Sequence, residues 1–136
     1  MQKHKLRVQL SENLILVKAD ARLIVQVLVN LVDNAVKYTP KGSEILIETR
    51  QEGTNAVVSV SDNGSGISDE AKEYIFEMFY TGNSHAADSR RSLGLGLALC
   101  KSILHAHGGD IFVEDCQPHG ARFTFTLPAK EVQLHE

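Results

Sequence analysis

One segment of this sequence constrains the fold more than any other, because it combines an apolar face with a regular polar stripe. Apolar residues recur at helical spacing from position 23 to about position 38, and Asp20 before them is typical of an N-cap. On such a helix one face carries polar side chains: Gln26, Asn30, Asn34 and Lys37. Asparagine is a mediocre helix former, so helix propensity does not explain two asparagines one turn apart. The stripe suits a magnesium–polyphosphate group better than a core.

The side chains of this stripe also suggest individual roles. Asn34 offers an amide oxygen, a hard ligand suited to Mg²⁺, which takes few protein ligands and keeps several waters. Lys37 can reach a phosphate as a point charge, and Tyr38 can stack against a base. A solvated face of an amphipathic helix is the simpler explanation for Lys37 alone. It does not explain the pair Asn30 and Asn34.

A second motif, Asp62-Asn63-Gly64-Ser65-Gly66, follows a predicted strand. Asp62 can accept a hydrogen bond from the exocyclic amine of adenine, whereas guanine places a carbonyl oxygen there, so the motif favours adenine. Gly64 and Gly66 let the backbone approach a flat ligand closely. Asp-Asn-Gly is also common in hairpin turns, and a tight turn remains an alternative.

A third motif, Leu93-Gly94-Leu95-Gly96-Leu97, follows a long polar stretch and opens an apolar helical run. We expect Gly94 and Gly96 at the start of this helix, where free N–H groups and the helix dipole favour phosphate. The motif is neither a dinucleotide fingerprint nor a P-loop, because it follows no strand and no Gly-Lys-Ser/Thr comes after it. Helix packing explains the glycines about as well. The polar residues 80–93 before it are typical of a mobile functional loop.

The remaining pattern predicts an α+β fold with a mixed sheet and its helices on one side. Residues 1–12 read as a lead-in, 13–128 as the domain and 129–136 as a frayed tail. The predicted strands are 14–17, 44–50, 57–60, 111–113 and 122–127, and the further helices are 69–79 and from 94 to His107-Gly108-Gly109.

Composition narrows the classes of function. The chain has 136 residues and a net charge of −3, which argues against a nucleic-acid or anionic-membrane surface. No signal peptide and no apolar run of the roughly 20 residues needed to span a bilayer are visible. Cys100 reads as a buried small hydrophobe, and a reducing, cytoplasmic setting fits best. The histidines show no metal spacing. His105 and His107 lie in a last helical turn, and those expected to be solvated are His4, His85, His119 and His135.

Together these motifs resemble the catalytic ATP-binding domain of bacterial sensor histidine kinases, in the superfamily shared with DNA gyrase, heat-shock chaperones and mismatch-repair ATPases. The resemblance runs from about residue 14 to 128. The amino-acid sequence at residues 26–30 and 37–40 looks closest to that of the potassium-responsive sensor kinases. It implies a two-layer α/β sandwich of the Bergerat type, with a mostly antiparallel sheet on three helices. The matching boxes are Asn30–Tyr38 (N), Asp62–Gly66 (G1), Ile75–Phe79 (F), Leu93–Leu97 (G2) and Gly120–Pro128 (G3), with residues 80–93 as the ATP lid.

The resemblance implies ATP and Mg²⁺ as ligands and gives roles to single residues. Asn34 would be the metal ligand, Asn30 a phosphate or metal-water partner, and Arg90 or Arg91 a γ-phosphate contact from the lid. The full set of implied catalytic and nucleotide-binding residues is Asn30, Asn34, Lys37, Tyr38, Asp62, Gly64, Gly66, Ile67, Arg90, Arg91, Leu93, Gly94, Leu95, Gly96 and Leu97.

Three positions depart from the family's pattern. Ser92 stands where the G2 box usually opens with glycine, and Ala121 stands where the G3 box often has threonine. ATPases of the superfamily carry a water-activating glutamate four residues before the metal asparagine, where this chain has Asn30. An amide cannot act as a general base at neutral pH, so we expect phosphoryl transfer to a protein nucleophile rather than hydrolysis.

In the family that nucleophile is a histidine on a separate dimerisation domain. We therefore expect a fragment of a longer kinase that binds ATP without phosphorylating itself. Its partners would be its own dimerisation domain and a response regulator receiver domain, with no nucleic acid, and a membrane only through other parts of the parent chain. Two alternatives remain: a serine-kinase anti-sigma regulator, which usually keeps the glutamate, and a module that senses ATP without transferring phosphate.

Overall fold

The computed structural model describes residues 4–12, 15–77 and 87–130. The side chains of Tyr38, of residues 87–95 and of Lys130 lie outside this description. The elements in chain order are β1 (Lys5–Gln9), β2 (Leu16–Val17), α1 (Ala21–Tyr38), β3 (Glu44–Glu52), β4 (Asn55–Asp62), α2 (Asp69–Tyr74), α3 (Ala87–Ala106), β5 (Asp110–Asp115) and β6 (Ala121–Lys130).

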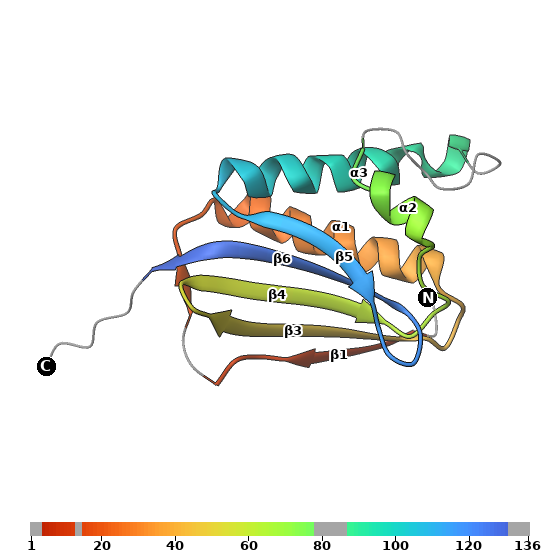
Figure 1. The fold of residues 1–136 in the computed structure, drawn as a ribbon, viewed down its shortest axis with the longest axis horizontal. Helices are drawn as coiled ribbons and strands as arrows, with labels where there is room; N and C mark the ends of the chain where they lie inside the picture. Colours follow the sequence, from red (N-terminus) through yellow and green to blue (C-terminus); the bar gives the residue numbers. More distant parts are fainter. Residues whose placement is uncertain (1–3, 13–14, 78–86, 131–136) are drawn as a thin grey trace, which may run out of the picture.

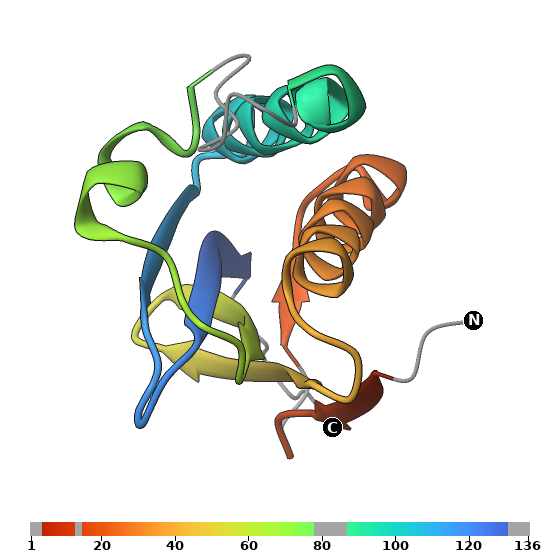
Figure 2. The same ribbon diagram turned by 90° about the vertical axis from the view of Figure 1, so that its right-hand side faces the viewer.

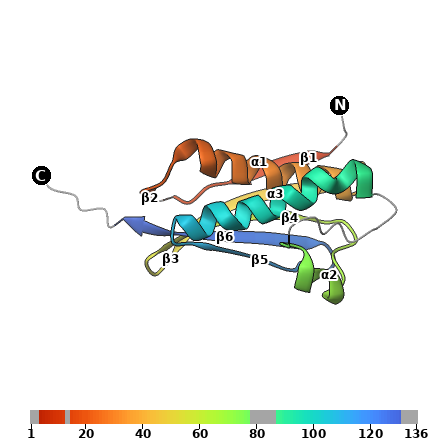
Figure 3. The same ribbon diagram turned by 90° about the horizontal axis from the view of Figure 1, so that it is seen from above.

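The described strands form one six-stranded sheet in the order β1-β3-β4-β6-β2, with β5 also paired to β6. β1 pairs with β3 in parallel, whereas the other pairs are antiparallel. Helices α1 and α3 cover one face of this sheet as a second layer (Figures 1 and 2). Seen from above, they run side by side, with α2 at one end (Figure 3). The predicted two-layer fold with a mixed, mostly antiparallel sheet is confirmed.

Helix α1 forms where its apolar spacing predicts. The Asp20 side chain accepts a hydrogen bond from the Arg22 backbone N–H at 3.0 Å, which satisfies one of the free donors of the first turn. Val27 and Leu31 are fully buried at 0% exposure. They pack with Leu104 of α3 and Phe125 of β6, so one core joins both layers.

Two boundaries differ from the prediction at the ends of the sheet. Lys5–Gln9, read as a lead-in, is a strand whose backbone pairs with β3. Leu6 and Val8 alternate with polar residues, which is a strand pattern that the prediction overlooked, although all residues of the strand are exposed. At the other end, Ala129 and Lys130 were assigned to a frayed tail but pair with β2. Residues 131–136 lie outside the described residues.

The helices after β4 also differ. Helix α3 begins at Ala87, although residues 87–92 were predicted as loop and the helix start at Gly94. Alanine and arginine in this stretch are good helix formers, and a projecting helix end needs no apolar periodicity. Gly94 and Gly96 therefore lie inside α3 and not in its first turn. Helix α2 ends at Tyr74 rather than at 79, and residues 78–86, with half of the predicted lid, lie outside the described residues.

Candidate nucleotide-binding site

Three of the predicted motifs meet at one end of the sheet. Strand β4 ends at Asp62 where β6 begins, and Ser61 is paired with Arg122 across the two strands. The loops after β4 and before β6 are therefore neighbours. Helix α1 ends at Tyr38 and leads into β3, whose Ile45 is paired with Asp62, so its last turn lies at the same end.

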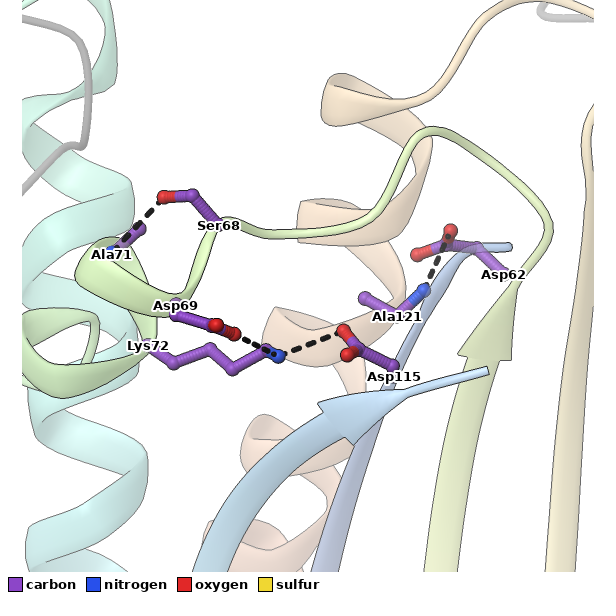
Figure 4. A network of polar contacts seen from close by, with 7 residues as sticks. All are labelled: Asp62, Ser68, Asp69, Ala71, Lys72, Asp115 and Ala121. Atoms are coloured by element: carbon purple, nitrogen blue, oxygen red, sulfur yellow. Dashed lines mark hydrogen bonds and ion pairs between the residues drawn. The ribbon is translucent and has the colours of Figure 1, made fainter. Parts of the chain in front are cut away.

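The Asp62 carboxylate is held in place by both loops. Its Oδ1 accepts the backbone N–H of Gly64 at 2.8 Å and that of Ala121 at 3.3 Å, the second bond being drawn in Figure 4. Both bonds engage Oδ1, so Oδ2 is the oxygen that a ligand amine would use. The side chain is half-buried, which strengthens its bonds and lets a ligand reach it. This geometry fits the predicted contact with the adenine amine.

The glycines of these loops permit close contacts within the protein. A Cβ on Gly64 would lie 2.7 Å from the Thr39 Cγ2, and a Cβ on Gly120 would overlap the carbonyl oxygen of Asp62. Gly66 has φ +87° and Gly120 φ +116°, values that side chains rarely adopt. The tight-turn explanation is therefore confirmed, and it is compatible with a ligand contact at Asp62, which stays a prediction.

One residue of the polar stripe of α1, Asn30, lies against Gly96 and Cys100 of α3. The Asn30 Nδ2 donates to the Cys100 Sγ at 3.7 Å, which turns the amide oxygen away from the thiol. A Cβ on Gly96 would lie 3.6 Å from the Asn30 Cγ, so the N and G2 boxes are brought together. Asn34 is buried at 6% exposure, one turn further along. An amide oxygen is a hard ligand, so the side chains of Asn30 and Asn34 are of a type that suits Mg²⁺ bound mainly by phosphates and water.

Lys37 is paired rather than pointing freely into solvent. Its Nζ lies 3.3 Å from the Asp33 Oδ2, and both side chains are about half exposed, at 51% and 49%. Such an exposed i,i+4 pair is worth only about 0.3–0.5 kcal/mol. A bound phosphate could therefore take the ammonium away from Asp33 at little cost.

Cys100 is buried as predicted. Its exposure is 0%, and its Sγ lies 3.8 Å from the Val27 carbonyl oxygen, to which it donates. Burial raises the pKa of the Cys100 thiol to about 11, against a smaller opposing effect of the Asn30 hydrogen bond. The sulfur facing Asn30 is therefore a neutral thiol at physiological pH.

A further ion-pair cluster ties α2 to the sheet. The Lys72 Nζ lies 2.8 Å from the Asp115 Oδ1 at the end of β5 and 3.1 Å from the Asp69 Oδ1 (Figure 4). The hydrogen bond to Asp115, followed by that to Asp69, raises the pKa of Lys72. Sequence reasoning missed this residue; the i,i+3 spacing of Asp69 and Lys72 was its only signal. Phe76, just after α2, packs edge-on against Phe123 with ring centroids 6.0 Å apart.

Three histidines make structural contacts that the sequence did not show. The His119 Nδ1 lies 2.9 Å from the Gly64 carbonyl oxygen, although the residue is exposed, as predicted. His4 was expected to be solvated but is half-buried, with its Nε2 2.9 Å from the Thr39 Oγ1. His107 joins the helices, because its Nδ1 donates to the Ile103 carbonyl and its Nε2 accepts the Asp20 N–H. Among the described residues, no group of three or more His, Cys, Asp or Glu side chains is placed to hold a metal ion.

Other predicted site residues are placed only in part. Ile67 is half-buried against the core, and Leu97, at 4% exposure, belongs to the core itself. Gly94 lies within α3. The side chains that lie outside the described part of the chain are Tyr38, Arg90, Arg91, Leu93 and Leu95.

An apolar groove of about 360 Å³ lies elsewhere on α1. None of the predicted site residues lines it, and its walls offer almost no polar group to a nucleotide. We therefore do not assign it to the nucleotide site. The lining residues are Leu28, Val29, Val32, Asp33, Val36 and Ile47.

Comparison with known proteins agrees with this arrangement. Residues 19–131 match the family of histidine kinase-, DNA gyrase B-, and HSP90-like ATPases. The chain belongs to this family. It is 46% identical over 125 residues to the sensor protein KdpD of Clostridium acetobutylicum, covering 92% of this chain and 14% of that one. A nucleotide-free catalytic domain of histidine kinase ThkA superposes with a TM-score of 0.78 at 35% identity, covering 93% of this chain and 79% of that one.

ThkA has also been solved in complex with the response regulator protein TrrA. The kinase in that complex superposes with a TM-score of 0.75 at 32% identity, over 93% of this chain and 34% of that one. The predicted resemblance is confirmed: this is a histidine kinase ATPase domain of the two-component sensor kinase type. The chain spans only 14% of the KdpD relative. None of its described helices is long and apolar enough to cross a membrane.

Proposed function

We propose that this chain binds MgATP and, as part of a longer kinase, transfers the γ-phosphoryl group to a histidine on a separate dimerisation domain. The observation that carries the proposal is the Asp62 carboxylate, whose Oδ1 is held by backbone N–H groups of two loops, at 2.8 and 3.3 Å. A half-buried carboxylate fixed in this way favours a ligand that offers a hydrogen-bond donor, such as the adenine amine.

The phosphate end of the ligand would lie between α1 and α3. Asn34 would hold Mg²⁺, with Asn30 on its water or on phosphate, and Lys37 would leave Asp33 for phosphate. Bound Mg²⁺ neutralises charge on the phosphates, and the protein's part is to position them. Tyr38 stacking on adenine and an Arg90 or Arg91 contact to the γ-phosphate complete the proposed site. Gly94 and Gly96 would let a phosphate come close to α3 but offer it no free N–H group, because they lie inside the helix.

Asn30 favours transfer over hydrolysis. Its Nδ2 is used in the bond to Cys100, and an amide has no lone pair basic enough to activate water. The same residue counts against the anti-sigma serine kinase alternative. A module that senses ATP without transfer would show the same binding, so only a supplied acceptor separates it from a kinase.

The partners follow from this chemistry. We infer that the acceptor is a histidine-bearing dimerisation domain of the same parent chain, and that a response regulator receives the phosphoryl group from it. The complex of ThkA with TrrA supports the second step by analogy. A cytoplasmic location of this domain is part of the same proposal.

The test uses the chain with γ-labelled ATP and Mg²⁺, with and without a supplied histidine-bearing dimerisation domain. We expect no label on the chain alone and label on the supplied domain. Calorimetry should show MgATP binding to the wild type and a large loss in Asp62→Asn, which keeps the size of the side chain but not its charge. Robust self-labelling, or unchanged binding in Asp62→Asn, would contradict the proposal.

A further inference from the structure

We propose that His119 is a positioning residue for nucleotide selectivity: it holds Gly64, and through Gly64 it holds the Asp62 carboxylate that selects adenine. This inference rests on the proposed function, since it concerns the base end of the same site. His119 lies in the turn between β5 and β6, on a different segment from the residues that it holds.

The hydrogen-bond direction at His119 is determined by chemistry. Its Nδ1 lies 2.9 Å from the Gly64 carbonyl oxygen, which can only accept, so Nδ1 carries a proton. The Gly64 N–H in turn donates to the Asp62 Oδ1 at 2.8 Å. Gly64 is thus bonded on both sides, to His119 through its carbonyl and to Asp62 through its amide.

Packing against α1 limits the loop from another direction. A Cβ on Gly64 would lie only 2.7 Å from the Thr39 Cγ2, so the backbone lies directly against this side chain. Thr39 is itself fixed, because its Oγ1 donates to the Ala35 carbonyl at 2.6 Å and contacts the His4 Nε2 at 2.9 Å. The loop therefore rests on α1, and His119 ties it to the turn before β6.

The two loops are also in direct contact behind Asp62. A Cβ on Gly66 would lie 3.3 Å from the Gly120 carbonyl oxygen, and Gly120 approaches the Asp62 backbone too closely for any side chain. His119 is the residue next to Gly120, and its bond is made by a side chain, so it can be removed while these backbone contacts stay. Substitution of His119 therefore tests the position of the loop without changing the loop's own sequence.

Selectivity is the property that this tie should control. ATP presents an amine to Asp62 and ITP presents a carbonyl oxygen, while their phosphates and ribose are identical. A carboxylate held in one place favours the amine and repels the carbonyl, whereas one that can turn away discriminates less. A residue that only supported folding would change the affinity for both nucleotides by the same factor.

The experiment measures dissociation constants for ATP and ITP in the presence of Mg²⁺ by calorimetry. It compares the wild type with two variants whose new side chains are isosteric with each other. His119→Asn keeps a donor N–H near the position of Nδ1, whereas His119→Asp has no donor and repels the Gly64 carbonyl. We expect His119→Asp to bind ATP about 3- to 10-fold more weakly, the range of one lost hydrogen bond, with little change for ITP. His119→Asn should retain most of the wild-type preference.

His105→Ala is the matched control. This exposed histidine also contacts another residue through its ring, a carboxylate at the start of β5, but it lies at the opposite end of that strand from His119. It should leave the ratio of ATP to ITP affinity unchanged. An unchanged ratio in His119→Asp, or an equal loss for both nucleotides, would overturn the role of His119 alone. A wild type that does not prefer ATP over ITP would overturn the assignment of Asp62 as well, and with it the proposed function.

Discussion

Gly96→Ala separates the two explanations that the sequence left open for the glycines of the third motif. Gly96 lies within α3, and an added Cβ would meet the Asn30 Cγ at 3.6 Å, an ordinary van der Waals distance. Alanine is about 1 kcal/mol more favourable than glycine inside a helix, because it restricts the unfolded chain and covers the backbone. With no clash to oppose this gain, we expect Gly96→Ala to stabilise the protein.

The magnitude can be measured directly. About 1 kcal/mol in a domain of this size raises the melting temperature by roughly 3 to 5 °C. The same variant should bind MgATP several-fold more weakly, since the proposed phosphates approach the backbone at this position and the new methyl group faces Asn30. We therefore expect opposite effects on stability, followed by thermal denaturation, and on MgATP affinity, followed by calorimetry.

Ala98→Gly is the matched control, two residues along the same helix and half-buried. It should lose about 1 kcal/mol of stability and keep its MgATP affinity. If Gly96→Ala is destabilised, the space that the structure shows beside Asn30 is wrong. If it is stabilised with unchanged affinity, Gly96 serves helix packing only, and its assignment to the phosphate site is refuted.

Three further variants test other contacts. Gly64→Ala should place its methyl group 2.7 Å from the Thr39 Cγ2 and push the loop away. We expect at least a tenfold loss of MgATP affinity while the circular dichroism spectrum stays native. Wild-type affinity would count against the close packing. Lys72→Met removes both ion pairs of Lys72, so hydrogen exchange of the backbone amides should become faster in α2 but not in β4. Exchange in α2 at the wild-type rate would show that these pairs do not hold the helix. Because the pKa of Cys100 is raised to about 11, the folded chain holds this proton more tightly than the unfolded chain. The stability that this bound proton contributes is complete below about pH 9 and is lost towards pH 11, by roughly 3 kcal/mol. Urea denaturation should show this loss in the wild type and not in Cys100→Ala, and parallel pH profiles would refute it.

The parts of this fold that could be predicted are those marked by residues close together in the sequence, such as a cap, an apolar repeat or a turn. Helix α1 has an N-cap at Asp20 and an apolar face that repeats at helical spacing, and both appear as expected. The pair of strands β3 and β4 was predicted because their alternation brackets a turn at Gly53. Asp62 was predicted to bind adenine because it stands at the end of a predicted strand and can accept a hydrogen bond from an amine; this role stays a prediction, while its place at the strand end is confirmed.

The parts that were missed depend on partners far away in the sequence. Lys5–Gln9 does alternate polar and apolar residues, but the run is short and its apolar residues stay exposed, so its strand depends on the ladder to β3. His119 gains its contact to Gly64 across 55 positions, and Lys72 gains Asp115 from the end of β5. A polar side chain near a turn looks the same in sequence whether it meets water or a carbonyl, so such contacts need the fold first. The start of α3 was misplaced for a related reason. Residues 87–92 include good helix formers but show no apolar periodicity, and they were therefore predicted as loop.

The contact between α1 and α3 explains why an amide suits position 30. Asn30 offers a donor and an acceptor on opposite sides of one short side chain: Nδ2 reaches the neutral Cys100 thiol, and Oδ1 remains on the polar face. A glutamate there would be longer by one methylene, would have no N–H for the sulfur and would bring a charge against Gly96 in a half-buried space. The absence of a general base at position 30 and the close packing of the two helices are thus one feature, and the proposed preference for transfer over hydrolysis would have its origin in this helix interface.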